Sequence, residues 1–155
     1  MGAGLPRPGA ESQAYAVELR EQGKTLAGRV IFAGYRADMP AVLNALDVLV
    51  VASRTETAPM VLLEALACGV PVVSTPVGRA PELLADGTAG RLFPIGDSHA
   101  LAKILLPLLD SPELRTAMSR SAREIAVARF PLTGFIQTLE EIIQAELTRV
   151  NVNLS

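Results

Sequence analysis

The chain has 155 residues, of which 50% are hydrophobic, 19% charged and 4% aromatic, and its formal net charge is −2. This length fits one domain with a substantial core, so we expect residues 1–155 to form a single domain. The slightly acidic balance argues against a nucleic-acid-binding protein, and a single cysteine, Cys68, excludes an internal disulfide framework.

The first third of the chain predicts two helices and two strands after a loop. Gly and Pro are frequent in residues 1–13, which we expect to form a loop-like N-terminal segment. Residues 14–22 favour a helix, and residues 29–34 (RVIFAG) are a short, β-branched apolar run typical of a buried strand. A second short helix is expected over residues 39–45 and a second strand over residues 47–53.

The rest of the chain continues this alternation. Residues 59–68 favour a helix, because Pro stands at the first position and Gly follows the end. Residues 70–75 predict a third strand, residues 79–85 a short helix and residues 90–94 a fourth strand. Three further helices are expected over residues 97–109, 112–129 and 132–150.

The strands and helices together indicate the fold class. Strands that are unbroken runs of Val, Ile and Leu are usually covered on both faces, and their alternation with helices is typical of βαβ units. The sequence therefore predicts an α/β fold with a parallel, Rossmann-like sheet of about four strands and flanking helices.

Ligands of such sheets bind at the carboxyl ends of the strands, near helix N-termini. Residues 53–59 lie between the second strand and its helix, where free backbone N–H groups and the helix dipole favour a phosphate. Glu56 in this loop is suited to a neutral hydroxyl beside the phosphate, and the carboxylate of Glu64 to a diol such as a ribose. Tyr35 and Arg36 follow the first strand and form the second candidate strand end.

The stretch 56–73 (ETAPMVLLEALACGVPVV) resembles the signature of family 4 retaining glycosyltransferases: Glu, seven residues, Glu, then a small-residue helix end and Gly-x-Pro-Val-Val. The flanking segments resemble further elements of that family in the same order. They are the strand and turn at 30–35, the strand at 47–53, the Pro-Glu and Asp-Gly elements at 78–90 and the helical run at 97–130.

This resemblance implies the C-terminal, donor-binding half of a GT-B enzyme that uses a nucleoside-diphosphate sugar. It implies that Glu64 holds the ribose hydroxyls and that Glu56, the catalytic candidate, faces the transferred sugar. The resemblance also implies that the intervening loop holds the distal phosphate and sugar and that the base packs at the turn after the first strand. The implied substrate-binding residues besides Glu64 are Thr57, Ala58, Pro59, Met60, Val61, Tyr35 and Arg36. No metal or other cofactor is implied.

Three local departures from the family pattern stand out. Thr57, Ala58 and Pro59 replace the usual Gly-Phe-Gly or Gly-Leu-Pro, which adds side chains where the backbone approaches the sugar. Arg79 replaces the second Gly of a Gly-Gly pair. Pro107 is expected to kink its helix or end it early.

The resemblance also implies that the domain's opening strand, helix and strand, with its basic diphosphate clamp, and the acceptor-binding domain are absent. We therefore expect a fragment or split subunit that is truncated on its N-terminal side. Missing strands would leave a gap in the sheet, so a protein partner or a second copy is expected to complete it. Little or no transferase activity is expected from the chain alone.

Several alternatives stay open at this point. Glu64 is also explained as a solvent-facing helix residue and Glu56 as a partner of the helix dipole. Cys68 fits a small buried hydrophobe, and His99, with no neighbouring acid or nucleophile, a structural residue. The alternative function is a non-catalytic nucleotide-binding or protein-interaction module derived from such an enzyme; a dinucleotide-dependent enzyme ranks third.

The sequence also gives an expectation for the cellular location of the protein. No run of about 18 uncharged apolar residues is present, so a transmembrane segment is not expected. No leader pattern is evident at the N-terminus, and the expected compartment is the cytoplasm.

Overall fold

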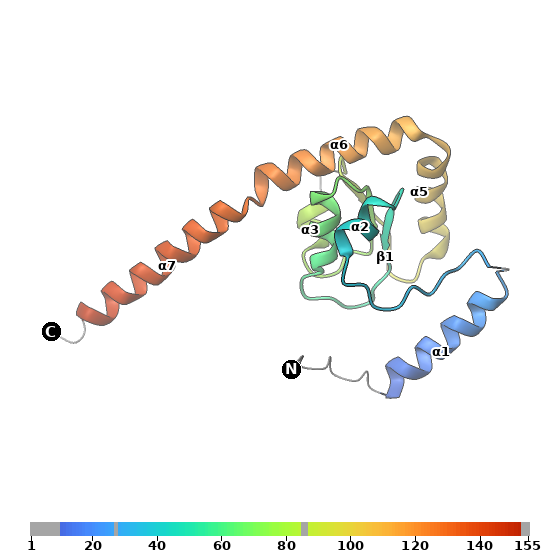
Figure 1. Ribbon diagram of the computed structural model, residues 1–155, viewed down its shortest axis with the longest axis horizontal. Helices are drawn as coiled ribbons and strands as arrows, with labels where there is room; N and C mark the ends of the chain where they lie inside the picture. Colours follow the sequence, from blue (N-terminus) through green and yellow to red (C-terminus); the bar gives the residue numbers. More distant parts are fainter. Residues whose placement is uncertain (1–9, 27, 85–86, 153–155) are drawn as a thin grey trace. The chain divides into compact units, whose positions relative to one another are not determined.

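The computed structural model describes residues 10–26, 28–84 and 87–152 (Figure 1). By its internal contacts the chain divides into two units, Met1–Ala37 and Asp38–Ser155. The prediction that all 155 residues form one domain stays a prediction, and each unit is described by itself.

The described part of the first unit contains one helix, α1 (Ala10–Lys24). The helix begins earlier than expected, so the predicted loop is wrong over residues 10–13, while residues 1–9 lie outside the described part. The strand predicted for residues 29–34 is also wrong: this segment has no regular secondary structure, and Ile31 and Phe32 are 85% and 50% exposed. A strand needs a neighbour to pair its backbone N–H and C=O groups, and no described strand pairs with this segment.

The second unit is built on a parallel sheet. Strands β1 (Leu49–Val51), β2 (Val72–Ser74) and β3 (Gly90–Leu92) lie in the order β1-β2-β3. Leu49 pairs with Val72, and Val72 pairs with Gly90. The predicted α/β fold with a parallel sheet is therefore confirmed, with three strands among the described residues instead of about four.

The described part of this unit has six helices. Their bounds are α2 (Met39–Asn44), α3 (Met60–Ala67), α4 (Ala80–Leu84), α5 (Ser98–Asp110), α6 (Pro112–Arg129) and α7 (Leu132–Val152). Helix α2 precedes β1, α3 and α4 lie between strands, and the other three follow β3. Of the two effects expected of Pro107, a kink or an early end, the early end does not occur, because α5 continues through Pro107 to Asp110. Pro107 still accepts a backbone hydrogen bond from Ser111, which closes the last turn of the helix.

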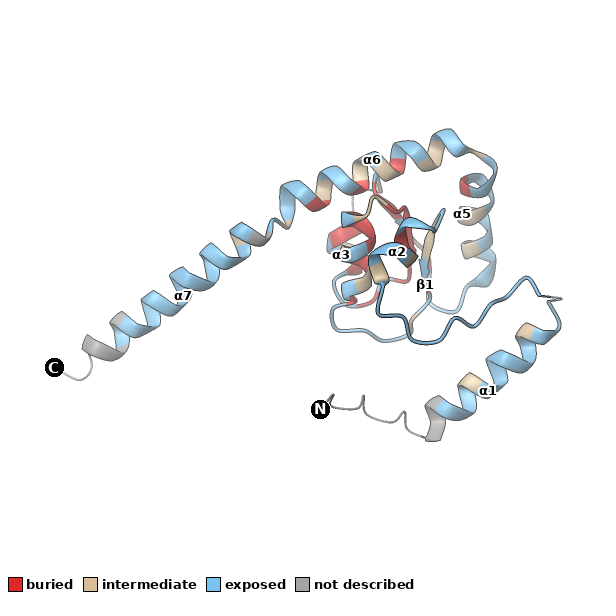
Figure 2. Cartoon of the chain, viewed as in Figure 1, coloured by how far each residue is buried: buried red, intermediate tan, exposed pale blue. Residues whose placement is uncertain are grey.

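The core lies on both faces of β2, because successive strand residues point to opposite sides of a sheet. Val72 packs in a cluster with Leu62 and Leu66 of α3. Val73 packs in a second cluster with Leu108 of α5 and Met118 of α6. Figure 2 shows this buried centre in red around α3 and the sheet. The central strand is therefore covered on both sides, which holds its carboxyl end in place.

Among the described residues of the second unit, two surfaces have no partner within that unit. β1 is the first strand of the sheet and pairs there with β2 alone. Helix α7 carries large apolar side chains that are exposed (pale blue in Figure 2). They are Phe135, Ile136, Leu139, Ile142, Ile143 and Leu147.

Candidate functional site

The candidate site lies where β1 and β2 end. In a parallel sheet these carboxyl ends meet at the same edge, so the segments that follow them are neighbours. Residues 52–59 connect β1 to α3, and residues 75–79 connect β2 to α4. The two segments carry the predicted Glu56 loop and the Gly78-Arg79 turn.

Buried Thr75 joins the two segments. Its backbone N–H donates a hydrogen bond of 2.9 Å to the carbonyl of Val51, and its hydroxyl donates one of 2.6 Å to the carbonyl of Ser53. The Ser53 hydroxyl in turn donates to the carboxylate of Glu56 at 3.2 Å. A continuous series of hydrogen bonds therefore connects the end of β2 to the catalytic candidate.

Gly78 brings the segments into direct contact. Its φ is +50°, a conformation that L side chains rarely adopt. A Cβ atom at this position would clash with the carbonyl oxygen of Thr57 and lie 2.9 Å from that of Glu56. Only glycine lets the second segment approach the Glu56 loop this closely.

Helix α3 begins at this contact. Pro59 is its N-cap residue and makes no side-chain cap hydrogen bond. The N–H of Leu62 bonds to the carbonyl of Pro59, while the N–H groups of Met60 and Val61 precede the intrahelical ladder. Within the described part of the chain, donors of the first turn therefore remain for water or a ligand.

The predicted site residues of this unit lie at or near that helix start. Thr57 and Ala58 are exposed, Pro59 is buried, and Met60 is 59% exposed. Glu64 is exposed one turn after Met60, so it shares that side of α3, away from the buried face of Leu62, Ala65 and Leu66. No hydrogen bond or ion pair of the Glu64 carboxylate occurs among the described residues, so nothing there occupies it.

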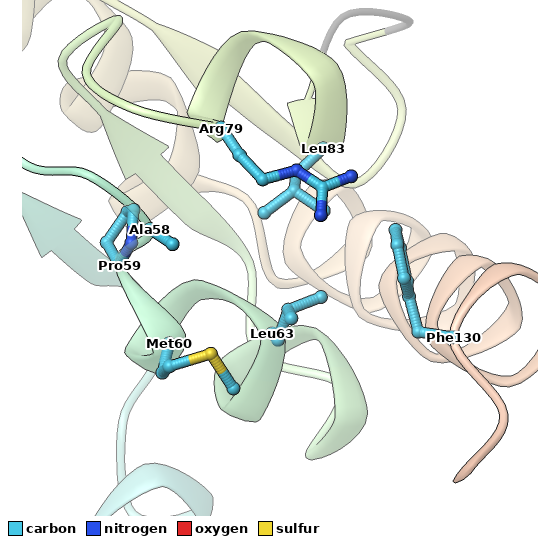
Figure 3. A pocket seen from close by; sticks show the side chains of 7 residues that line it. All are labelled: Ala58, Pro59, Met60, Leu63, Arg79, Leu83 and Phe130. Carbon is cyan, nitrogen blue, oxygen red and sulfur yellow. The ribbon is translucent and has the colours of Figure 1, made fainter. Parts of the chain in front are cut away.

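A small pocket opens beside the start of α3 (Figure 3). Its volume is about 60 Å³. The lining residues are Ala58, Pro59, Met60, Leu63, Arg79, Leu83 and Phe130. The sequence placed only the first three of these in the site. Arg79 was visible as a departure from the family pattern, whereas Leu63, Leu83 and Phe130 gave no signal, because apolar helix residues equally indicate core.

Tyr35 and Arg36 belong to the first unit, and both are exposed, Tyr35 to 80%. Their predicted place beside the nucleotide base stays a prediction. His99 is exposed in the first turn of α5, where Asp97 caps the helix by accepting a 2.8 Å hydrogen bond from the N–H of Ala100. Cys68 is a free thiol of intermediate exposure.

Over the described ranges, no cluster of three or more His, Cys, Asp or Glu side chains is suited to hold a metal ion. The same part of the chain has no helix long and apolar enough to span a membrane. A lowered pKa occurs outside the pocket: hydrogen bonds from its own backbone N–H and from the Ser111 hydroxyl lower the pKa of Glu113 at the start of α6.

Known proteins resemble this chain in sequence and in fold. A family model described as glycosyl transferases group 1 matches residues 6–111. An N-acetyl-alpha-D-glucosaminyl L-malate synthase of Bacillus anthracis is 35% identical over 114 residues, covering 74% of this chain and 30% of that protein. The chain thus spans about a third of the length of the relatives it matches.

Two solved structures are similar to most of the chain. Alr3699/HepE of Anabaena, solved in complex with UDP-glucose, has 33% identity and a TM-score of 0.80 over 86% of this chain and 37% of that one. The C-terminal domain of LpcC, a glycosyl transferase group 1 family protein of Francisella tularensis, has 26% identity and a TM-score of 0.73. That match covers 80% of this chain and 66% of the LpcC chain.

These matches confirm the predicted likeness to GT-B glycosyltransferases in both sequence and fold. The matching region contains the Glu56 loop, α3 and the Gly78 turn, which together form the candidate site. The chain belongs to the glycosyl transferases group 1 family.

Proposed function

We propose that this chain binds a nucleoside-diphosphate sugar and forms the donor-binding part of a retaining glycosyltransferase. The observation that carries the proposal is the contact of Gly78 with the Glu56–Thr57 backbone, beside the uncapped start of α3. Oriented N–H groups and a helix N-terminus stabilise the negative charge that develops on a leaving diphosphate. UDP is the first nucleotide to test, since UDP-glucose is the ligand of the similar Anabaena protein.

Each candidate residue has a role in this proposal. Glu64 accepts hydrogen bonds from the ribose hydroxyls, and the backbone around Met60 and Val61 holds the diphosphate. Glu56, held by the Ser53 hydroxyl, faces the transferred sugar and acts as the catalytic carboxylate. The remaining contacts are assigned to Thr57, Ala58 and Pro59 for the sugar and to Tyr35 and Arg36 for the base.

Thermal unfolding with millimolar UDP, GDP, ADP and NAD tests donor binding. A nucleotide present at about 100 times its Kd stabilises the folded chain by about 2.7 kcal/mol, which raises Tm by several degrees. We expect one nucleoside diphosphate to give this shift and Glu64→Ala to abolish it. Glu124→Ala, which removes an exposed carboxylate from α6, is the matched control and retains the shift.

A folded wild-type chain whose Tm responds to none of the nucleoside diphosphates contradicts the proposal. A response to NAD alone indicates a dinucleotide-binding domain instead. The retaining mechanism is tested separately, by NMR of the anomeric proton in a product formed in the presence of an acceptor-binding chain. Inversion of the anomeric configuration excludes it.

A non-catalytic binding module is the second candidate. The Thr57-Ala58 pair favours it, because it adds side chains where the backbone of the family approaches the transferred sugar. A module binds UDP, yet releases no UDP from UDP-glucose even when an acceptor-binding chain is added. Restored turnover with such a companion chain supports the enzyme, and we expect little or none without it.

The open edge of β1 supports a further part of the proposal, that a protein partner or a second copy completes the sheet. Exposed strand edges readily pair with another chain. Sedimentation of the wild type is expected to show association, and Val50→Lys, a charge on this edge strand, to reduce it. A compact wild-type monomer that captures no companion chain contradicts this part.

A further inference from the structure

The side chain of Arg79 brings a positive charge to the pocket beside α3. Of the seven residues that line the pocket, Arg79 alone is charged. Figure 3 shows its guanidinium extending from the turn before α4 across the pocket from Met60 and Leu63. The remaining lining is apolar, so any polar group that enters the pocket meets this guanidinium without competition from a lining carboxylate.

The backbone around Arg79 is held on both sides. Gly78 before it packs against the Thr57 carbonyl, and Ala80 after it is completely buried at the start of α4. Packing of Gly78 and Ala80 therefore fixes the position of the Arg79 backbone. The side chain itself stays 60% exposed and can adjust to a ligand.

The guanidinium of Arg79 has binding capacity left. Its Nε donates a hydrogen bond of 3.0 Å to the carboxylate of Glu82, which is 62% exposed. Such exposed pairs contribute little to stability, so ligand binding can replace this one at small cost. No hydrogen bond of the two Nη groups occurs within the described ranges, which leaves the outer fork of the guanidinium available.

The size and charge of the pocket select the kind of group that fits. About 60 Å³ admits a group of a few atoms and excludes a nucleoside. The planar fork of arginine matches the oxygens of a phosphate, and these charge-assisted hydrogen bonds are stronger than those to neutral hydroxyls. A phosphate is thus the ligand group that uses both the charge and the size.

We propose that Arg79 is a phosphate-binding residue of this site, whose Nη groups hold one phosphate of a nucleoside diphosphate beside Met60. This inference rests on the proposed donor-binding function and adds to it a cation supplied by the turn before α4. It assigns a use to the arginine that stands where the family pattern has glycine.

Calorimetric titration with UDP and with uridine tests this role, because uridine lacks the phosphates. We expect Arg79→Ala to weaken UDP binding about tenfold and to leave uridine binding unchanged. Arg120→Ala removes another exposed arginine, from α6 and outside this pocket, and is expected to leave both affinities unchanged. Glu82→Gln breaks the ion pair but keeps the arginine, so UDP binds equally well or more tightly.

The outcomes separate this inference from the function on which it rests. Unchanged UDP affinity in Arg79→Ala overturns the phosphate role alone. Equal weakening by Arg79→Ala and Glu82→Gln also overturns it, since Arg79 then acts only through its ion pair. A folded wild-type chain that binds neither UDP nor uridine, with Glu64→Ala indistinguishable from it, overturns the proposed function and this inference together.

Discussion

The hydroxyl of Thr75, just after β2, donates a 2.6 Å hydrogen bond to the backbone carbonyl of Ser53, just after β1. The two residues are 22 positions apart in the sequence. Their bond joins the ends of neighbouring strands, and the Ser53 hydroxyl extends it to Glu56. A side chain of the core thereby positions the loop of the candidate site.

Replacing Thr75 by valine keeps the shape of the side chain and removes its donor. Because Thr75 is fully buried, we expect Thr75→Val to lower the free energy of unfolding by about 1–2 kcal/mol. Urea denaturation measures this change. Thr116→Val is the control: this exposed hydroxyl donates to the carbonyl of Pro112 within α6, where water replaces it. Equal effects of the two substitutions contradict the prediction.

Gly78→Ala tests the contact between the two segments. The new Cβ clashes with the Thr57 carbonyl and the positive φ disfavours any side chain, so we expect a loss of roughly 2–4 kcal/mol in unfolding free energy. Gly96→Ala is a matched control, since Gly96 has φ +78° but open space around its Cβ position. It is expected to lose only about 1 kcal/mol. Chemical denaturation measures the loss of unfolding free energy in both variants. A larger loss in Gly78→Ala shows that the steric clash dominates, whereas equal losses show that the positive φ does.

Arg115 of α6 contacts both the end of α5 and the segment just before β1. Its Nη1 donates to the carbonyls of Leu108 and Leu109 at 2.7 and 2.9 Å, and its Nε lies 3.5 Å from the carboxylate of Asp47. The Arg115 side chain is only 23% exposed, whereas that of Asp47 is 71% exposed.

We therefore expect Arg115→Ala to lower the free energy of unfolding by about 2 kcal/mol, because two carbonyls lose a charged donor. Asp47→Ala is expected to change it by less than about 0.5 kcal/mol, since the ion pair is open to solvent. Thermal unfolding of both variants checks the ranking. A larger loss in Asp47→Ala would show that the ion pair matters more than the capped carbonyls.

Glu113 gives a prediction for acid pH. Hydrogen bonds from its own N–H and from Ser111 hold the pKa of this carboxyl below its ordinary value in the folded chain. Between the folded and the ordinary pKa the unfolded chain binds more protons than the folded one, so the free energy of unfolding rises with pH. The contribution of Glu113 to stability is therefore fully present at neutral pH. The contribution is lost as the pH falls through the folded pKa.

NMR titration of the Glu113 side chain measures the shift directly. We expect Ser111→Ala, which removes one of the two hydrogen bonds, to raise the pKa of Glu113 toward its ordinary value. A titration midpoint of wild-type Glu113 at or above the ordinary carboxyl value would contradict the assignment.

Much of the second unit was predictable from local sequence. The unbroken valine and leucine runs identified the parallel strands β1 and β2, of which only β2 is buried throughout, and the Pro and Gly that flank α3 marked its limits. The ordered series of short motifs that includes Glu56 and Glu64 likewise indicated the family and the region of the candidate site. These signals are local, since each depends on residues a few positions apart.

What the sequence could not decide depends on partners distant along the chain. Residues 29–34 have the composition of a strand, but a strand exists only where another strand pairs with its backbone, and none of the described strands does so. Three features of the site join segments that lie about 20 residues apart in the sequence. They are the approach of Gly78 to Thr57, the Thr75–Ser53 hydrogen bond and the place of Arg79 in the pocket. The sequence by itself therefore determined the family, most of the helices and the three strands of the parallel sheet. Only the tertiary structure decided which strand pairs and which side chains meet, because those depend on the packing of both faces of β2.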